Sequence, residues 1–197
     1  MSVGGWPATW LRRLTAHAPP YRRIADFLPP PSADRLLAEL IHRQDKFRAR
    51  GRSPAGEPRF YRMLTPLEPP SEFARRFEQM APLLERQFGA SLVGARIELR
   101  GQAYGDGCSF GKHSDADAGG PNWQRRLSGI YYLHTRPRRF TGGALVLFDR
   151  RGGMYPVEPD HNSAVFFPGS LVHEVLPVSC ASPAFADCRF ALNVWIS

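Results

Sequence analysis

The chain has 197 residues, of which 43% are hydrophobic and 22% are charged, a balance typical of a folded globular protein and not of a disordered one. This length suits a single domain, and no run of about 18 apolar residues is present to span a membrane. The first 20 residues contain no continuous apolar stretch of the kind found in secretory signals, so we expect a cytoplasmic protein with no membrane partner.

The net charge is +8, and it comes almost entirely from arginine, since Lys46 and Lys112 are the only lysines. An excess of this size fits an anionic partner. It fits equally well a solvated arginine surface that reflects composition alone, and this second interpretation is the simpler one.

The three cysteines are Cys108, Cys180 and Cys188, and they form no C-x-x-C pair. Their odd number and wide spacing argue against a zinc ribbon and against a disulfide framework. Free or structural thiols are expected, with a Cys180–Cys188 disulfide as the alternative.

The N-terminal half predicts two helices and a basic loop between them. Residues 1–31 look irregular, and Ser32 then offers an N-cap to a helix with one apolar stripe, which contains Leu36, Leu37, Leu40 and Ile41. Residues 47–62 combine glycines and prolines with five arginines, which is typical of a loop: Arg48, Arg50, Arg52, Arg59 and Arg62. A second helix is expected from about Ser71 to Gly89, with a kink or break at Pro82.

From about residue 92 the apolar period changes to two, which predicts strands. The expected strands are separated by Gly, Pro and Asp clusters and cover residues 92–104, 126–133, 144–148, 163–167, 171–175 and 189–196. No internal repeat or linker divides the chain, so we expect one domain over residues 1–197. Helical support and the basic loop would occupy residues 1–91, and an antiparallel jelly roll, or double-stranded β-helix, residues 92–197.

The segment from Tyr104 to Asp115 indicates a metal site. His113 and Asp115 stand at positions i and i+2 of an extended segment, so both side chains project to one face and can ligate the same ion. His173 is the natural candidate for a third ligand. Two histidines and one carboxylate that leave coordination positions open are the ligand set of non-haem Fe(II) oxygenases.

The last expected strand has two different faces. One face is apolar and carries Phe190, Leu192, Val194 and Ile196, whereas the other carries Arg189, Ala191, Asn193 and Trp195. A buried arginine is costly without an anionic partner, and its planar fork suits a carboxylate. The pattern therefore predicts a dicarboxylate cosubstrate beside the metal or, as the structural alternative, a protein carboxylate that pairs with Arg189.

These motifs, in this order, resemble the Fe(II)- and 2-oxoglutarate-dependent dioxygenase superfamily, and in particular its prolyl-4-hydroxylase-like branch, which includes the hypoxia-sensing prolyl hydroxylases. The resemblance is close over residues 94–197 and looser from about residue 22. It rests on Tyr104–Asp115, Ser128–Leu133, Thr141–Leu145, Ala164–Pro168, His173–Val175 and Arg189–Trp195.

The resemblance implies a jelly-roll enzyme that uses Fe(II), 2-oxoglutarate and O2, with ascorbate as a reductant, to hydroxylate an unactivated C–H bond. It implies these roles: iron ligands His113, Asp115 and His173; Arg189 and Tyr132 on the distal carboxylate of 2-oxoglutarate; Tyr104 near its metal-bound end or the substrate; Asn193 and Trp195 in the pocket wall. Two departures stand out. Asn193 occupies a position where threonine or serine is expected, and the long spacing between His173 and Arg189 predicts an enlarged loop at residues 179–188.

The substrate implied by this branch is a peptidyl or protein side chain, with proline first. A free amino acid or a natural product is the alternative among enzymes. We do not expect a nucleic-acid partner, because the nucleobase-demethylating group has a second arginine after the anchoring one and none follows Arg189. From other classes, a metal-free jelly-roll binding module would require the triad and Arg189 to be coincidental. A zinc hydrolase on the same ligands would explain neither Arg189 nor the polar face of the last strand.

The remaining polar residues near these motifs have simpler interpretations. Surface or loop positions are expected for His17, His42, His134 and His161. Asp117 is expected to be a solvated loop carboxylate, with replacement of Asp115 as ligand the alternative. By parity Tyr131 should lie in the core, and Glu174 should point away from the metal.

Overall fold

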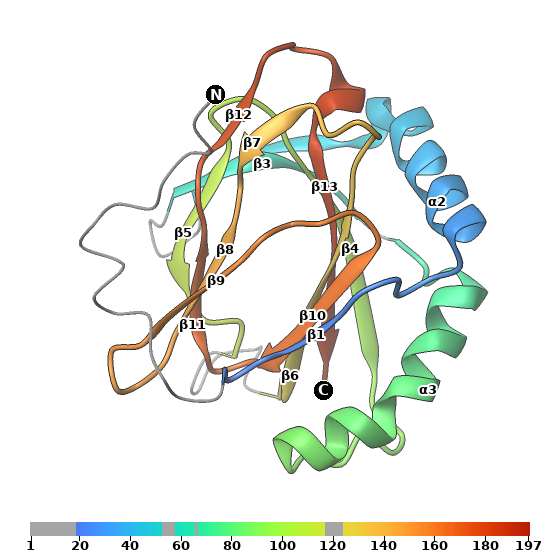
Figure 1. Cartoon of the computed structure of the whole chain (residues 1–197). Helices are drawn as coiled ribbons and strands as arrows, with labels where there is room; N and C mark the ends of the chain where they lie inside the picture. Colours follow the sequence, from blue (N-terminus) through green and yellow to red (C-terminus); the bar gives the residue numbers. More distant parts are fainter. Residues whose placement is uncertain (1–18, 53–57, 66, 117–123) are drawn as a thin grey trace.

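The computed structural model describes residues 19–52, 58–65, 67–116 and 124–197. Two α-helices, α2 (Pro30–His42) and α3 (Ser71–Phe88), lie on one side of a mostly antiparallel β-structure (Figure 1). The strands are β1 (Arg22–Ile24), β2 (Arg48–Arg52), β3 (Pro58–Leu64), β4 (Ile97–Tyr104), β5 (Ser109–His113), β6 (Leu127–Leu133), β7 (Phe140–Gly142), β8 (Leu145–Phe148), β9 (Met154–Val157), β10 (Ser163–Pro168), β11 (Val172–Val175), β12 (Val178–Cys180) and β13 (Arg189–Ile196).

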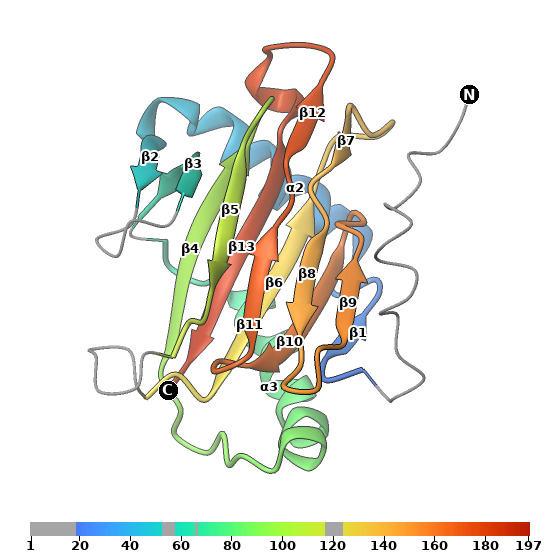
Figure 2. The ribbon, with the colours of Figure 1, turned by 90° about the vertical axis from the view of Figure 1, so that its left-hand side faces the viewer.

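The strands form two facing layers, which Figure 1 shows from the edge and Figure 2 shows face on, with β5, β11, β8 and β9 in front. Across the described chain the strand order is β1-β10-β6-β13-β4-β3-β5-β11-β8-β9, with β2 paired to β3. Strand β3 joins the layers, because it pairs with β4 through Arg62–Leu64 and with β5 through Arg59 and Phe60. This architecture confirms the predicted jelly roll.

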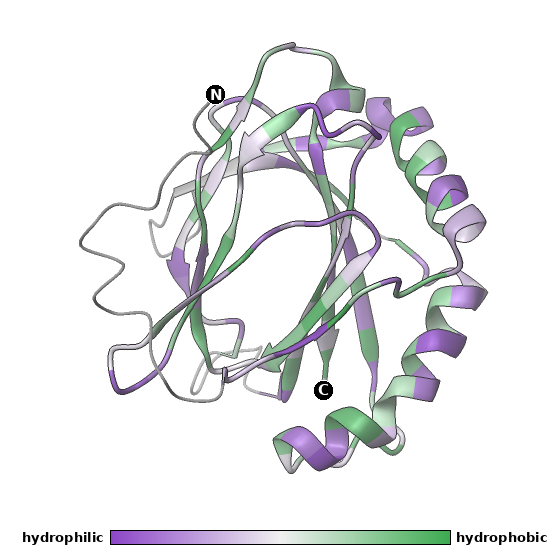
Figure 3. Cartoon of the chain, viewed as in Figure 1, coloured by the Kyte–Doolittle hydropathy of each residue, from purple (hydrophilic) through white to green (hydrophobic). Residues whose placement is uncertain are grey.

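Strand β13 separates two hydrophobic clusters. Its residues Phe190, Leu192, Val194 and Ile196 belong to the cluster under the helices, whereas Ala191 belongs to the cluster between the two layers. The predicted two-faced strand is therefore confirmed. Both helices are amphipathic and turn an apolar stripe to the first cluster (Figure 3), through Leu36, Leu37 and Leu40 in α2 and Phe73, Phe77 and Leu84 in α3.

The helix ends agree only in part with the sequence prediction. Helix α2 begins at Pro30 and not after an N-cap at Ser32, because proline at the first helical positions needs no donor there. Helix α3 continues through Pro82, so the predicted break is wrong, and the alternative of a kink stays a prediction. It ends at Gly89, whose φ of 65° is the left-handed conformation that glycine adopts at low cost.

The prediction of a basic loop over residues 47–62 is wrong. This segment contains strands β2 and β3, which pair as a hairpin and continue the sheet through β4. In β3, Tyr61 and Met63 are buried between the layers while Arg62 is exposed, which is the alternation of a half-buried strand. The turn of the hairpin lies outside the described residues.

The enlarged loop predicted at residues 179–188 is partly ordered as regular structure. Strand β12 extends into it as far as Cys180 and pairs with β7, and a 3-10 turn follows at Phe185–Asp187. Phe185 anchors the turn in the helical cluster, with ring centroids 5.1 Å from Phe47 and 5.2 Å from Phe190. This long connection is therefore held close to the start of β13.

All three cysteines are free, so the alternative of a Cys180–Cys188 disulfide is wrong. Tyr131 lies in the core as predicted. None of the helices in the described part of the chain combines the length and the apolar character needed to cross a membrane.

Candidate active site

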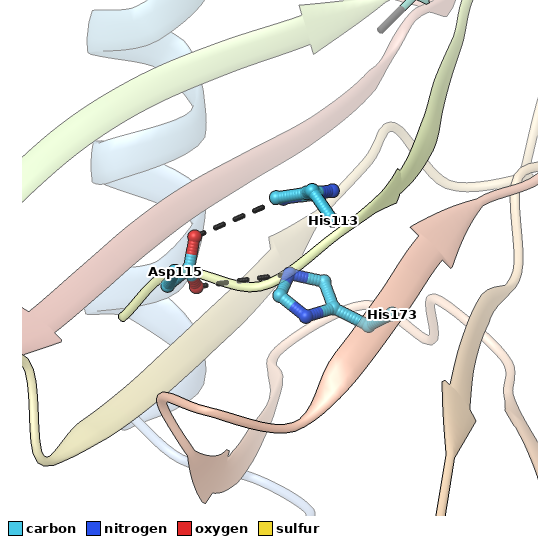
Figure 4. Close-up of side chains that lie close together, drawn as sticks. All are labelled: His113, Asp115 and His173. Carbon is cyan, nitrogen blue, oxygen red and sulfur yellow. Dashed lines mark ion pairs between the residues drawn. The ribbon is translucent and has the colours of Figure 1, made fainter. Parts of the chain in front are cut away.

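The three predicted metal ligands come together at one end of the space between the layers. His113 is the last residue of β5, Asp115 lies in the turn that follows, and His173 stands opposite His113 in the neighbouring strand β11. Asp115 Oδ1 is 3.8 Å from His113 Nε2, and Asp115 Oδ2 is 3.7 Å from His173 Nε2 (Figure 4). The ligand atoms all lie within 4.8 Å of one another, which is close enough for one ion to contact all three.

Backbone carbonyls orient both imidazoles. His113 Nδ1 is 2.8 Å from the carbonyl oxygen of Gly111, and His173 Nδ1 is 2.8 Å from that of Leu171. In the neutral ring this arrangement places the proton on Nδ1, where it is donated to the carbonyl, and leaves the Nε2 lone pair facing Asp115. Both rings are thus set in the tautomer that a metal requires.

Aromatic packing holds the same rings from behind. Phe110 stacks on His113 with ring centroids 3.7 Å apart, and Phe167 meets the edge of His173 at 4.8 Å. His173 is also almost completely buried. The two ligands are therefore fixed by packing before any ion binds.

Asp115 is held by its backbone as well as by its surroundings. The carbonyl oxygen of Gly169 accepts hydrogen bonds from the backbone N–H groups of Asp115 and Ala116, both at 3.0 Å. Burial opposes ionisation of the carboxyl, but the imidazoles of His173 and His113, together with Ser128 and Trp195, outweigh it and lower its pKa. Asp115 is therefore a carboxylate at neutral pH and can serve as a ligand.

The guanidinium of Arg189 lines a cavity that His113 and His173 also line. It is buried, with 1% of the residue exposed. Its Cζ atom is 4.8 Å from the ring centroids of both Tyr104 and Tyr132. Among the described residues no acceptor bonds to any of its three nitrogens, and the Tyr132 hydroxyl and Asn193 Oδ1 are also unpartnered. The structural alternative, a protein carboxylate paired with Arg189, is thus not found in this part of the chain.

The register of the strands shows how Arg189 and the metal ligands are connected. Strand β13 lies between β4 and β6, so that Ala191 is flanked by Gln102 and Tyr132, and the next inward position, Asn193, is flanked by Arg100 and Ile130. The small side chain of Ala191 leaves space between them. A cavity follows this row of positions and is lined by Gln102, Tyr104, Phe110, His113, Ile130, His173, Val175, Arg189 and Asn193.

Comparison with known proteins agrees with this geometry. The family model of the 2OG-Fe(II) oxygenase superfamily matches residues 99–197. The chain belongs to this superfamily. This superfamily is one of oxygenases that use Fe(II) and 2-oxoglutarate, and the His113–Asp115–His173 cluster is a donor set that suits the metal.

One relative is similar to this chain in sequence, and two solved structures are similar to it in fold. An uncharacterized PKHD-type hydroxylase of Synechocystis sp. is 30% identical over 190 residues, which cover 89% of this chain and 62% of that protein, so the chain spans less than two thirds of that relative. The fold is similar to a Pseudomonas putida prolyl-4-hydroxylase (TM-score 0.64, 21% identity, 96% of this chain and 97% of that one). It is also similar to a Trichoplax adhaerens prolyl hydroxylase in complex with a hypoxia inducible factor peptide (TM-score 0.63, 17% identity, 90% and 83%).

The residues of this oxygenase fit both groups that the family requires. The donor set of two neutral imidazoles and one carboxylate suits Fe(II), and the unpartnered buried guanidinium suits an anionic end of 2-oxoglutarate. Burial raises the pKa of Tyr132 to about 12 despite the opposing effect of Arg189, and it also raises the pKa of Tyr104 well above its ordinary value. Both hydroxyls are therefore protonated at neutral pH, and the unpartnered hydroxyl of Tyr132 is available as a hydrogen-bond donor.

Two consecutive glycines bring the backbone close to Arg189. Gly142 and Gly143 have φ values of 68° and 71°, in the left-handed region. A Cβ atom at Gly142 would lie 2.4 Å from the carbonyl oxygen of Pro177, and one at Gly143 would lie 2.8 Å from Arg189 Cδ. The T-G-G-A motif is thus explained by the need to close the chain over the stem of Arg189.

Sequence reasoning missed one polar residue of the cavity, Gln102. It is buried, and its Oε1 accepts a hydrogen bond of 2.9 Å from the Tyr104 hydroxyl. Its parity with Tyr104 in the same strand was a usable signal. Conversely, Trp195 lies at the Asp115 end, at the next inward position after Asn193, and faces the carboxylate.

The other histidines separate into three cases. His42 is exposed as predicted, whereas His17, like Asp117, lies outside the described residues. His134 lies in the loop after β6, as one of the two predicted alternatives has it, but it is buried, and its Nε2 accepts the backbone N–H of His161 at 3.0 Å. This pair joins the end of β6 to the chain before β10, so its role is structural.

We expect Arg189→Leu to raise the KM for 2-oxoglutarate by at least tenfold, because hydrogen bonds to charged groups contribute roughly 1.5–3 kcal/mol. Arg189→Lys should restore only part of this affinity, since an ammonium cannot reproduce the planar fork. Initial rates at varied 2-oxoglutarate test both variants. An unchanged KM in Arg189→Leu would mean that another residue holds the cosubstrate.

Gly143→Ala should raise the same KM while leaving metal affinity unchanged, because the added Cβ displaces the stem of Arg189 and not the ligands. The left-handed φ adds a loss of stability of about 1–2 kcal/mol. Thermal unfolding and Mn(II) titration measure the two quantities. Gly152→Ala is the matched control: it has the same kind of φ but nothing within 4 Å of the new atom, and it should cost stability without any effect on KM.

Proposed function

We propose that this oxygenase hydroxylates a side chain of a peptide or protein, with proline as the first candidate residue. The observation that carries the proposal is a cavity lined by His113 and His173, which lie beside Asp115, and also by the unpartnered guanidinium of Arg189. The peptide substrate class is supported by the PKHD-type relative and by the fold shared with prolyl hydroxylases, one of them bound to a peptide.

The triad would hold Fe(II) through His113 Nε2, His173 Nε2 and the Asp115 carboxylate. When bound, Fe(II) together with 2-oxoglutarate and O2 supplies the oxidising power for hydroxylation of a C–H bond. Three protein ligands leave coordination positions open for the cosubstrate. Because the Nδ1 atoms are already engaged with carbonyls, the rings need no rearrangement to bind the ion.

Arg189 and Tyr132 would bind the distal carboxylate of 2-oxoglutarate. The guanidinium neutralises its charge in a buried place, and the protonated Tyr132 hydroxyl donates a hydrogen bond to it. Ala191 gives the carbon chain room to pass along β13 toward the metal. Phe110, Ile130 and Val175 are the apolar side chains of the cavity wall and limit the access of water.

The substrate would approach on the side of β3. Tyr61 of this strand stacks on Tyr104 with centroids 5.1 Å apart, and it also contacts Phe110 at 5.6 Å. The hairpin therefore presents an aromatic wall to the cavity and exposed arginines, among them Arg50 and Arg62, to the outside. A rigid wall of this kind would help to hold a C–H bond in a fixed position beside the metal.

His113→Ala, Asp115→Ala or His173→Ala should each abolish the conversion of 2-oxoglutarate to succinate, with the fold retained, because each removes one of three ligands and none belongs to the hydrophobic clusters. Succinate release with Fe(II) and ascorbate measures the loss, and circular dichroism measures the fold. Substantial turnover in Asp115→Ala would move the carboxylate role to another residue, with Asp117 as the first to test.

Peptide and free-acid substrates can be compared directly by mass spectrometry. Proline-containing peptides should gain 16 Da in the presence of 2-oxoglutarate, whereas free proline should stay unmodified. The same increase on a free amino acid alone would replace the peptide proposal with the small-molecule alternative. No gain on any substrate, together with no turnover of 2-oxoglutarate, would contradict the enzymatic function itself.

Replacing Arg50 and Arg62 by glutamine should lower kcat/KM for a peptide with acidic flanking residues and leave substrate-independent 2-oxoglutarate turnover intact. The reason is that the arginines attract such a peptide but lie outside the cosubstrate site, and the effect should fade as salt is added. Arg22→Gln, an exposed arginine on β1, is the control. Loss of both activities together would show that the hairpin arginines are structural.

A further inference from the structure

Trp195, near the end of β13, lies between two arginines. The Cζ atom of Arg125 is 4.1 Å from the centroid of its ring, and that of Arg100 is 5.0 Å away. The indole itself is buried, with 7% of the residue exposed. Cation–π contacts of this kind gain strength when they are partly shielded from water, so the indole is held in one orientation.

A single carboxylate fixes both cations. Glu98 Oε1 accepts hydrogen bonds from Arg100, with Nε at 2.9 Å and Nη2 at 2.6 Å, and Glu98 Oε2 accepts one from Arg125 Nη2 at 3.0 Å. Glu98 stands opposite Trp195 in the pairing of β4 with β13. The four side chains therefore form a closed group, which we call the Trp195 brace: Glu98, Arg100, Arg125 and Trp195.

The brace faces the carboxylate end of the metal triad. Trp195 stands opposite Ser128 in the pairing of β13 with β6, and its indole lies against the Asp115 side chain. The backbone adds a second connection. Gly169, whose carbonyl accepts the N–H groups of Asp115 and Ala116, packs so closely on Arg125 that a Cβ atom there would lie 2.3 Å from the Arg125 carbonyl oxygen.

Exposed ion pairs usually contribute little, yet this group differs in its surroundings. The Arg125 side chain is only 12% exposed, and the ring that it covers is buried against a metal ligand. Residues that orient a ligand from behind typically change metal affinity by 10- to 100-fold when they are removed. Removal of Glu98 or Arg125 is therefore expected to change the metal affinity. Their charged groups would act through the Trp195 ring and not by direct contact with the metal ligands.

We propose that Glu98, Arg100 and Arg125 are positioning residues that hold Trp195 against Asp115 and thereby set the affinity of the site for a divalent metal. This inference rests on the proposed role of Asp115 as a ligand. The geometry also implies an order within the brace. The two arginines hold the indole of Trp195 in place, and the indole in turn positions the carboxylate of Asp115.

Titration of the metal-free protein with Mn(II), followed by electron paramagnetic resonance, measures this affinity without any turnover. Arg125→Gln should weaken Mn(II) binding about tenfold. Arg126→Gln is the matched control, because Arg126 is the neighbouring residue but is exposed and donates to the carbonyl of Ser91 at 2.7 Å. This control should bind Mn(II) like the wild type.

A double-mutant cycle tests this order within the brace. Trp195→Phe keeps an aromatic ring between the arginines but lacks the indole N–H, and it should weaken Mn(II) binding on its own. Arg125→Gln in the Trp195→Phe background should then add much less than tenfold, because the arginine acts through the indole. If the double variant instead loses Mn(II) affinity by the product of the two single losses, Arg125 does not act through the indole and this part of the proposal is overturned.

Unchanged Mn(II) affinity in a folded Arg125→Gln protein would overturn the inference. If that variant fails to fold by circular dichroism, Glu98→Gln releases both arginines without removing either, and the same criterion applies to it. Asp115→Ala separates the two proposals. Wild-type Mn(II) affinity in Asp115→Ala would contradict the metal site itself, whereas loss of affinity there with none in Arg125→Gln or Glu98→Gln would contradict the brace alone.

Discussion

A buried guanidinium with no anion to bond is the constraint on which the rest of the site depends. Arg189 starts the central strand β13 and lies between two tyrosine rings, and none of its nitrogens has an acceptor in the described chain. Keeping such a charge out of water costs several kcal/mol, which the tyrosine faces offset only in part. A carboxylate bound at the position proposed for the cosubstrate would remove this cost, so a part of its binding free energy would also stabilise the fold.

The same strand places the other functional groups at regular intervals. Because side chains alternate along β13, one face packs under the helices and the other presents Arg189, Ala191, Asn193 and Trp195 in sequence. Arg189 stands at the end proposed to bind the cosubstrate, and Trp195 stands at the other end, beside Asp115. The core packing that fixes the apolar face therefore also fixes the distance between the two ends of the cavity.

Local spacing explains why much of the site could be predicted from the sequence. His113 and Asp115 are two residues apart, and the alternation of β13 is visible without a structure. Other features depend on contacts between distant segments. Arg125 reaches Trp195 from a separate connection, and β3 was hidden by glycine, proline and arginine, since its alternation is stabilised by pairing with β4 and β5 and not by its own composition. Strands of three or four residues, such as β1, β7 and β12, carry too few side chains to show a period at all.

The distribution of pairing suggests why one fold accommodates different substrates. The groups proposed to bind metal and cosubstrate stand on strands paired on both sides along much of their length, so their positions are strongly determined. The proposed substrate wall is β3, which bends between the layers and shares three pairs with β4 and two with β5. A strand divided in this way can shift or change its side chains at a smaller cost to the core than β13 can. Substrate preference is thus expected to lie in β3 and its hairpin, whereas the chemistry is fixed by the register of β13 with its two neighbours.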